Sequence, residues 1–206
     1  MISISYNQGA FRERLSQVLG QAKNPTAVLM AAGRELGNQL KAHFRKKDRE
    51  QPNRLSPRRE HFWLQVAGSV NAPVQTGYNS VGVRISDPRI AQKVFGGPIV
   101  AKNAGALTIP VSEKAYGRTA STFEKETGLK LFLVKVGGQG GSKLGNAVLA
   151  AKVGGGLEIE YVLKKSVTQA PDPTALPAES ELKKAILERA QSVLDRQLAG
   201  TAGTEV

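Results

Sequence analysis

The chain has 206 residues, of which 40% are apolar and 22% are charged, a composition typical of a globular protein and not of a disordered one. Lysine and arginine outnumber aspartate and glutamate by 29 to 17, and the net charge of +12 favours a polyanionic or acidic partner: nucleic acid, an anionic membrane or an acidic protein surface. The absence of cysteine excludes disulfides, thiolate metal sites and a cysteine nucleophile. No apolar signal-peptide core and no membrane-spanning apolar run is present, so we expect a protein made and used inside a cell, or one that is part of something assembled there.

The first 73 residues are predicted to be mainly helical. The alternating run ISISY at 2–6 favours a short strand, and apolar residues at helical spacing predict a helix over 8–20. Asn24 and Pro25 form a helix-start signal, because asparagine accepts a hydrogen bond from a free backbone N–H and proline needs no partner at the first helical position. The helix that follows, 25–47, has one apolar face, made of Leu29, Ala32, Leu36, Leu40 and Phe44.

Two further features are predicted within this helical part. Gly33 and Gly37 lie one turn apart in the helix, where they allow another backbone to pack closely. Residues 48–55 break the helical pattern, and Ser56 with Pro57 starts a second helix by the same capping logic. That helix ends near Asn71 and Pro73, and its apolar face consists of Phe62, Val66 and Val70, with Trp63 beside it.

Residues 74–163 are predicted to be mainly β, because short β-like runs alternate there with glycine and proline. The run at 106–111 contains Pro110, which cannot donate to a ladder, so it is an edge strand or a strand end. Gly154-Gly155-Gly156 predicts a hairpin turn within a three-stranded meander over 129–163, whose first connection is the long glycine loop 137–145. The strands of this meander are predicted at 129–136, 146–153 and 157–163, and a further strand is predicted at 81–85.

An extended, proline-bearing segment at 170–178 precedes the last predicted helix, at 179–198. Its inward residues are Leu182, Ile186, Val193, Leu194 and Leu198. Helices at the ends and strands in the middle predict an α+β fold, with a largely antiparallel sheet, helices packed on one face, N-terminal helices and a C-terminal helix. We expect one domain over 1–206, mainly helical at 1–73 and mainly β at 74–163.

No catalytic, cofactor or metal site is predicted. His43 and His61 lie on different predicted helices and have no metal-site neighbours. The loop GGQGGSKLG at 137–145 resembles a phosphate-binding loop, but the order Gly141-Ser142-Lys143 places serine before lysine and no helix clearly follows. A mobile hairpin loop explains it better, and such a loop could contact a neighbouring subunit.

The remaining acidic pair has a structural interpretation. Glu158 and Glu160 share one face of a strand by its period of two, while Leu157, Ile159 and Tyr161 on the opposite face are predicted to point into the core. A solvated sheet face explains the two carboxylates better than a general acid/base pair. We therefore expect no enzymatic activity and no cofactor.

The strongest chemical feature is a basic stretch that runs from 41 to 59, with His61, Phe62 and Trp63 directly after it. Three interpretations remain open: a surface that tracks phosphates, the solvated end of two helices with Trp63 in the core, or a basic rim that docks an acidic subunit. The C-terminal part, 171–206, is mildly acidic, so a ring of copies could join one subunit's acidic end to the next subunit's basic stretch. The candidate interface residues are Lys41, Arg45, Lys46, Lys47, Arg49, Arg54, Arg58 and Arg59.

Several motifs in this order resemble the virion morphogenesis proteins of Mu-like tailed phages, which belong with tail-completion, tail-terminator and neck proteins. The first are ISISY, FRERLSQVL, Asn24-Pro25, the segment AAGRELG and the closing HFR. They are followed by QPNRL at 51–55, His61-Phe62-Trp63, VFGGP at 94–98, LTIPV at 107–111 and Ala115-Tyr116-Gly117. The resemblance covers 1–120 in order and 156–198 more loosely. The basic, proline-containing segment 48–60 and the long glycine loop depart from the pattern.

This resemblance implies an α+β subunit that forms a ring, with six copies as the expected number, at the head-proximal end of a phage tail. Such rings cap the tail tube, join it to the head connector and have no enzymatic activity. The implied partners are further copies of the chain, the tail tube protein and the head–tail connector, with non-specific contact to phage DNA and no membrane contact. The implied location is the virion, after assembly in the host cytoplasm. The alternative that the residues leave open is a basic nucleic-acid-binding module acting in genome packaging.

Overall fold

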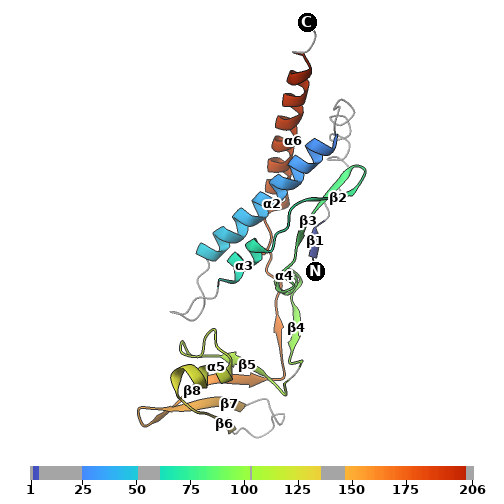
Figure 1. Cartoon of the computed structure of the whole chain (residues 1–206). Helices are drawn as coiled ribbons and strands as arrows, with labels where there is room; N and C mark the ends of the chain where they lie inside the picture. Colours follow the sequence, from blue (N-terminus) through green and yellow to red (C-terminus); the bar gives the residue numbers. More distant parts are fainter. Residues whose placement is uncertain (1, 5–24, 51–60, 103, 136–146, 203–206) are drawn as a thin grey trace. The chain divides into compact units, whose positions relative to one another are not determined.

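The computed structural model describes residues 2–4, 25–50, 61–102, 104–135 and 147–202 (Figure 1). The predicted helix at 8–20, the predicted helix start at Ser56 and the glycine loop 137–145 lie outside these residues. Within the described part, helices and antiparallel sheets form an α+β fold with N-terminal helices and a C-terminal helix, as the sequence predicts.

The chain groups into two compact units, whereas the sequence predicts one domain. Unit 1 comprises 1–50, 62–95 and 172–206, and unit 2 comprises 51–61 and 96–171. The strands of the described residues form three separate sheets, of three, two and four strands, and not the single sheet that we expected. Because a core is built where a sheet or helix buries one face, separate sheets lead to separate cores.

Unit 1 is built around three helices. α2 (Pro25–Glu50) begins at the predicted proline and runs three residues past the predicted end, so the predicted break is wrong for residues 48–50. Its whole predicted apolar face is buried, and it packs beside α6 (Glu179–Ala202) and α3 (Phe62–Gly68) (Figure 1). The shared core residues on these helices include Leu36, Leu40, Phe44, Val66, Leu182, Ile186 and Leu194.

A small sheet completes unit 1. Its order is β1-β3-β2, formed by β1 (Ile2–Ile4), β3 (Ser80–Ile85) and β2 (Val74–Gly77), and every pair is antiparallel. A Cβ on Gly33 of α2 would lie 2.5 Å from Val81 Cγ1 and 2.7 Å from Pro73 Cβ, so the glycine lets this sheet approach the helix. The short helix α4 (Arg89–Phe95) follows β3 and was not predicted.

Unit 2 contains a two-stranded ribbon and a four-stranded sheet. β4 (Gly97–Val100) pairs with β9 (Ser166–Gln169) to form the ribbon. The sheet has the order β5-β8-β7-β6, so β5 is an edge strand, as Pro110 predicts. Its members are β5 (Leu107–Pro110), β6 (Leu131–Lys135), β7 (Ala147–Val153) and β8 (Gly156–Lys164).

The predicted meander over 129–163 is confirmed, since β6, β7 and β8 pair in sequence. Gly154 and Gly155 have φ of +56° and +87°, and two successive positive φ angles make the tight turn whose twist suits a hairpin. One helix, α5 (Ala120–Thr127), was not predicted; it packs on one face of this sheet (Figure 1). Thr119 caps its N-terminus and Gly128, at φ +70°, closes its C-terminus.

Candidate functional site

The predicted basic patch separates into buried and exposed residues. On α2, Arg45, Lys46 and Arg49 are exposed and Lys41 is half-buried. Lys47 is 5% exposed, so its prediction as an interface residue is wrong. The other three members, Arg54, Arg58 and Arg59, lie outside the described residues.

Lys47 is held by a polar network inside unit 1. Its Nζ donates to Asp172 Oδ2 at 2.9 Å, to the Thr174 carbonyl at 2.8 Å and to Thr174 Oγ1 at 2.7 Å. Burial alone raises the pKa of Asp172, but the hydrogen bonds from Lys47 and Thr174 outweigh that effect and lower the pKa to about 2. All three ammonium donors are therefore satisfied within the subunit, and this cation anchors the segment before α6 to the end of α2.

The aromatic residues near the basic stretch belong to the core, as one of the three interpretations predicts. Trp63 is 7% exposed, stacks on Phe44 with ring centroids 5.9 Å apart, and lies under Lys47 Nζ at 4.5 Å. His43 also faces the protein, with Nε2 3.0 Å from the Thr174 carbonyl. Because a base-stacking platform needs an exposed ring, Trp63 does not supply one.

The exposed side of α2 carries a line of positive charge, which we call the basic stripe: Arg34, Lys41, Arg45 and Arg49. The spacings of seven, four and four residues place all four on one side of the helix. At a rise of about 1.5 Å per residue the stripe is about 22 Å long. Arg34 was not among the predicted interface residues, although its helical spacing from Lys41 was a usable signal.

The exposed side of α6 carries a line of the opposite sign, which we call the acidic stripe: Glu181, Glu188 and Asp195. These residues recur every seven positions and are all exposed, with Lys184 between the first two. The stripe spans about 21 Å. Three of the six acidic residues of the mildly acidic C-terminal part, 171–206, thus lie on one side of one helix.

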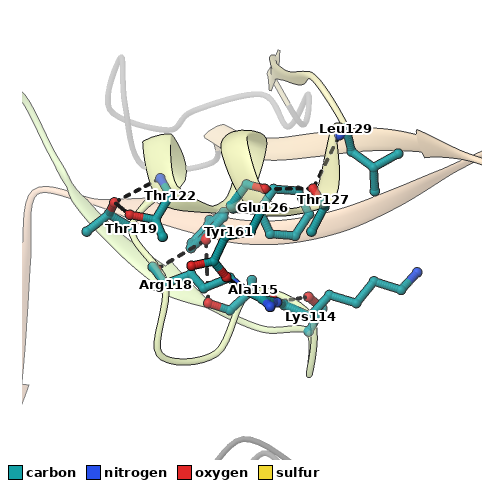
Figure 2. Close-up of polar contacts among 11 residues, drawn as sticks. Lys114, Ala115, Arg118, Thr119, Thr122, Glu126, Thr127, Leu129 and Tyr161 are labelled. Carbon is teal, nitrogen blue, oxygen red and sulfur yellow. Dashed lines mark hydrogen bonds and ion pairs between the residues drawn. The ribbon is translucent and has the colours of Figure 1, made fainter.

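In unit 2, Tyr161 joins the sheet to the loop that precedes α5 (Figure 2). The ring packs edge-on against Phe123 of α5, with centroids 6.0 Å apart, and the hydroxyl donates to the Arg118 carbonyl at 3.2 Å. Burial and the nearby charge of Glu160 raise the pKa of Tyr161. Tyr161 therefore marks the helix-covered face of the four-stranded sheet.

A β-bulge changes the predicted alternation of β8. Leu149 pairs with Tyr161 whereas its neighbour Ala150 pairs with Ile159, so Glu160 is an extra residue in the strand. Glu160 is fully buried rather than solvated, its Oε2 accepts a hydrogen bond from the Ser112 hydroxyl, and its Oε1 has no partner among the described residues. The prediction that Leu157 and Ile159 point into the core is wrong, since they are 59% and 49% exposed.

The bulge gives the sheet a second apolar face. Residues paired across antiparallel strands share a face, so the register separates the Tyr161 side from the opposite side. We call the opposite side the outer face. Its apolar members are Leu107, Ile109, Phe132, Val134, Val148, Ala150, Leu157, Ile159 and Val162. In unit 2, no described helix packs on the outer face, and its polar residues in the described register are Lys152 and Lys164.

The described residues contain no group of three or more histidine, aspartate or glutamate side chains that could hold a metal ion. No helix among them is long and apolar enough to cross a membrane. Comparisons with protein-family models, with curated proteins and with solved structures find no match to this chain.

Proposed function

We propose that the chain is a structural virion component at the head–tail junction of a tailed bacteriophage. Copies of it form a ring, with six as the expected number, that terminates the tail tube and joins it to the head connector. The proposal rests on the resemblance described above and on one structural observation, the apolar outer face of the four-stranded sheet.

The outer face is the observation that favours an assembly subunit. An antiparallel sheet in a free-standing protein commonly presents a polar face to water. Here the face opposite α5 is apolar across all four strands. At its β8 end Leu157 and Ile159 are 59% and 49% exposed, five other apolar members are half-buried, and Val148 and Ala150 are buried. Exposed and half-buried apolar residues that adjoin on one face of a sheet favour a protein contact there. We assign the outer face to contact with another virion subunit.

The charge is compatible with this location. A net charge of +12 suits a subunit near a channel through which the genome passes, and it suits docking on an acidic connector surface. The proposed partners are therefore copies of the chain, the tail tube protein and the connector.

The substitution Ile159→Lys tests the assembly role, because it places a charge on the outer face without filling a buried site. We expect wild-type protein to form a closed ring by native mass measurement and imaging, and Ile159→Lys to reduce assembly at least tenfold while circular dichroism stays unchanged. Thr168→Lys is the matched control, since Thr168 is an exposed strand residue of the same unit outside the outer face. Phage tails of normal length that join heads without this protein would contradict the proposal.

A nucleic-acid-binding role in genome packaging is the second candidate, and the basic stripe is the observation that favours it. Four cations along one helix side would release about four counterions from DNA, which predicts a log–log salt slope of about −3 to −4. Arg45→Glu should make that slope shallower by about one or more. Absence of DNA binding at about 50 mM salt would exclude this candidate.

A further inference from the structure

The basic stripe and the acidic stripe are nearly equal in length and opposite in sign, and they share a seven-residue interval. Arg34 and Lys41 are seven residues apart, as are Glu181 and Glu188, and on a helix this interval is about 10.5 Å. The stripes are about 22 and 21 Å long. A straight helix that carries one stripe can therefore face a helix that carries the other along its whole length.

The two stripes do not neutralise each other within one subunit. α2 and α6 meet through apolar residues of the unit 1 core, among them Leu40 and Ile186. Arg34, Arg45 and Arg49 are exposed on α2, as are Glu181, Glu188 and Asp195 on α6. No ion pair joins the basic stripe to the acidic stripe in the described residues; the recorded contact of Asp195 is a hydrogen bond from Gln191 of its own helix.

We propose that the basic stripe on α2 of one copy docks on the acidic stripe on α6 of the next copy. The contact is head-to-tail, because it joins two different surfaces of the same chain. Each copy thus uses its basic stripe toward one neighbour and its acidic stripe toward the other. Repetition of this contact closes a ring when the rotation between successive copies divides a full turn into a whole number of steps. This inference rests on the proposed ring and adds to the outer face a second pair of surfaces that join its copies.

The charges set the orientation of the copies more than they supply binding free energy. An exposed ion pair contributes about 0–1 kcal/mol, and salt screens it. Complementary stripes nevertheless speed correct encounters and disfavour contact between two like-charged surfaces. Assembly should therefore weaken as ionic strength rises.

Charge reversal with rescue tests the contact on the full-length chain. One variant carries Arg45→Glu and Arg49→Glu, and a second carries Glu181→Lys and Glu188→Lys. A third carries all four substitutions and restores opposite signs on the two helices. We expect each double variant to weaken the dissociation constant for self-association at least tenfold at about 50 mM salt, and the fourfold variant to recover to within about threefold of wild type.

A fourth variant is the control, with Lys46→Glu and Lys130→Glu. It makes the same charge change at exposed residues outside the basic stripe and should assemble as wild type does. Circular dichroism and thermal melting identify any variant that fails to fold, and a single substitution, Arg45→Glu or Glu188→Lys, then replaces the failed double variant.

The outcomes separate this inference from the proposed function. Rings that are unchanged by either reversal, or that are not restored by the fourfold variant, overturn the α2–α6 contact and leave the ring proposal standing. A wild-type chain that stays monomeric at about 100 µM overturns the ring proposal itself. Loss of DNA retention by Arg45→Glu/Arg49→Glu with no change in assembled mass identifies nucleic acid as the occupant of the basic stripe and also overturns the contact.

Discussion

At the scale of single residues, Lys47 shows that charge in a sequence does not reveal where that charge lies. It stands between Lys46, which is exposed, and Asp48, which is 8% exposed, in a run that looks uniformly polar. Its partners Asp172 and Thr174 are 125 and 127 residues away in the sequence, so no local pattern predicts the contact. Burial of the amphipathic stem beside Trp63 becomes favourable once these partners take up the ammonium group.

The Lys47–Asp172 pair predicts a dependence of stability on pH. Because the pKa of Asp172 is lowered from 3.8 to about 2, the pair stabilises the fold fully above pH 4 and is lost as the pH falls from about 4 to about 2. Asp172→Asn should lower the free energy of unfolding by at least about 1–2 kcal/mol at pH 7, allowing for the partial exposure of the carboxylate. Urea unfolding at pH 7 and near pH 2 measures the difference, which should shrink at the lower pH.

The exposed α2 residue Glu50 supplies the matched control for this measurement. Glu50→Gln should change the free energy of unfolding by less than about 0.5 kcal/mol at either pH. An Asp172→Asn defect of equal size at both pH values would contradict the assigned role of the carboxylate.

Ser112 and Glu160 provide a second test at the residue scale. Ser112→Ala leaves a buried carboxylate without its hydrogen-bond donor, so we expect a loss of about 1–3 kcal/mol in the free energy of unfolding. Replacing both partners, as in Ser112→Ala with Glu160→Leu, should recover part of that loss, because no buried carboxyl group is then left without its donor. Recovery will be incomplete, since Ser112 Oγ also accepts from the Ala115 N–H at 3.0 Å.

Chemical denaturation of the single and double variants measures these changes in the free energy of unfolding. Ser121→Ala is the control, because Ser121 is an exposed residue of α5. A double variant less stable than Ser112→Ala would show that Glu160 has a stabilising partner other than Ser112. The bulge that buries Glu160 was not predictable, because one extra residue shifts the register without changing the alternation of residue types in the sequence.

At the scale of the elements, the sequence predicts those whose signals are local and repeated. α2 carries both a proline start and five apolar residues at helical spacing, and the β6–β8 meander carries β-like runs and a glycine turn. The helices α4 and α5, of seven and eight residues, were missed, since so few turns give little periodicity. β4 and β9 were missed for a related reason: each has four residues, and their pairing joins positions about 70 apart.

Gly33 and Gly37 of α2 give a prediction at the scale of the elements, in which Gly37 is the control for Gly33. Gly33→Ala should destabilise the protein by about 1–3 kcal/mol despite the better helix propensity of alanine, because the new Cβ meets Val81 and the ring of Pro73 at under 3 Å. Gly37→Ala should be neutral or stabilising by up to about 1 kcal/mol, since its Cβ would lie 4.0 Å from Val70 and Val83. Thermal melting of the two variants compares them directly.

The opposite order of stability would mean that the sheet does not approach α2 at Gly33. Gly33 and Gly37 are equivalent by helix position, so the sequence predicted close packing at both. Only the structure distinguishes them, because the contact at Gly33 is made by residues some 40 to 50 positions further along the chain.

At the scale of the whole molecule, the segment 96–171 of unit 2 is an insertion in unit 1, and its two ends lie together. In unit 1 the Asp172 N–H donates to the Lys93 carbonyl at 2.8 Å, so the chain leaves and re-enters at one place. In unit 2, Gly97 pairs with Gln169 at the start of the β4–β9 ribbon. The sequence predicted one domain because helices at both ends and strands between them also describe one α+β sheet, and the hydrophobic pattern does not show which strands share a core.

This arrangement predicts that the segment 96–171 folds alone and that the remainder folds without it. The segment keeps its own core of Ala115, Phe123, Ala151 and Tyr161, and a short glycine-serine linker from Phe95 to Asp172 closes unit 1 around its separate core. We expect both proteins to unfold cooperatively and to give dispersed amide spectra. The isolated segment should self-associate through its outer face, and Ile159→Lys should abolish that association without unfolding it. A segment 96–171 that is unfolded with or without this substitution would contradict the prediction. It would show that the two units depend on each other for stability and unfold as one cooperative structure.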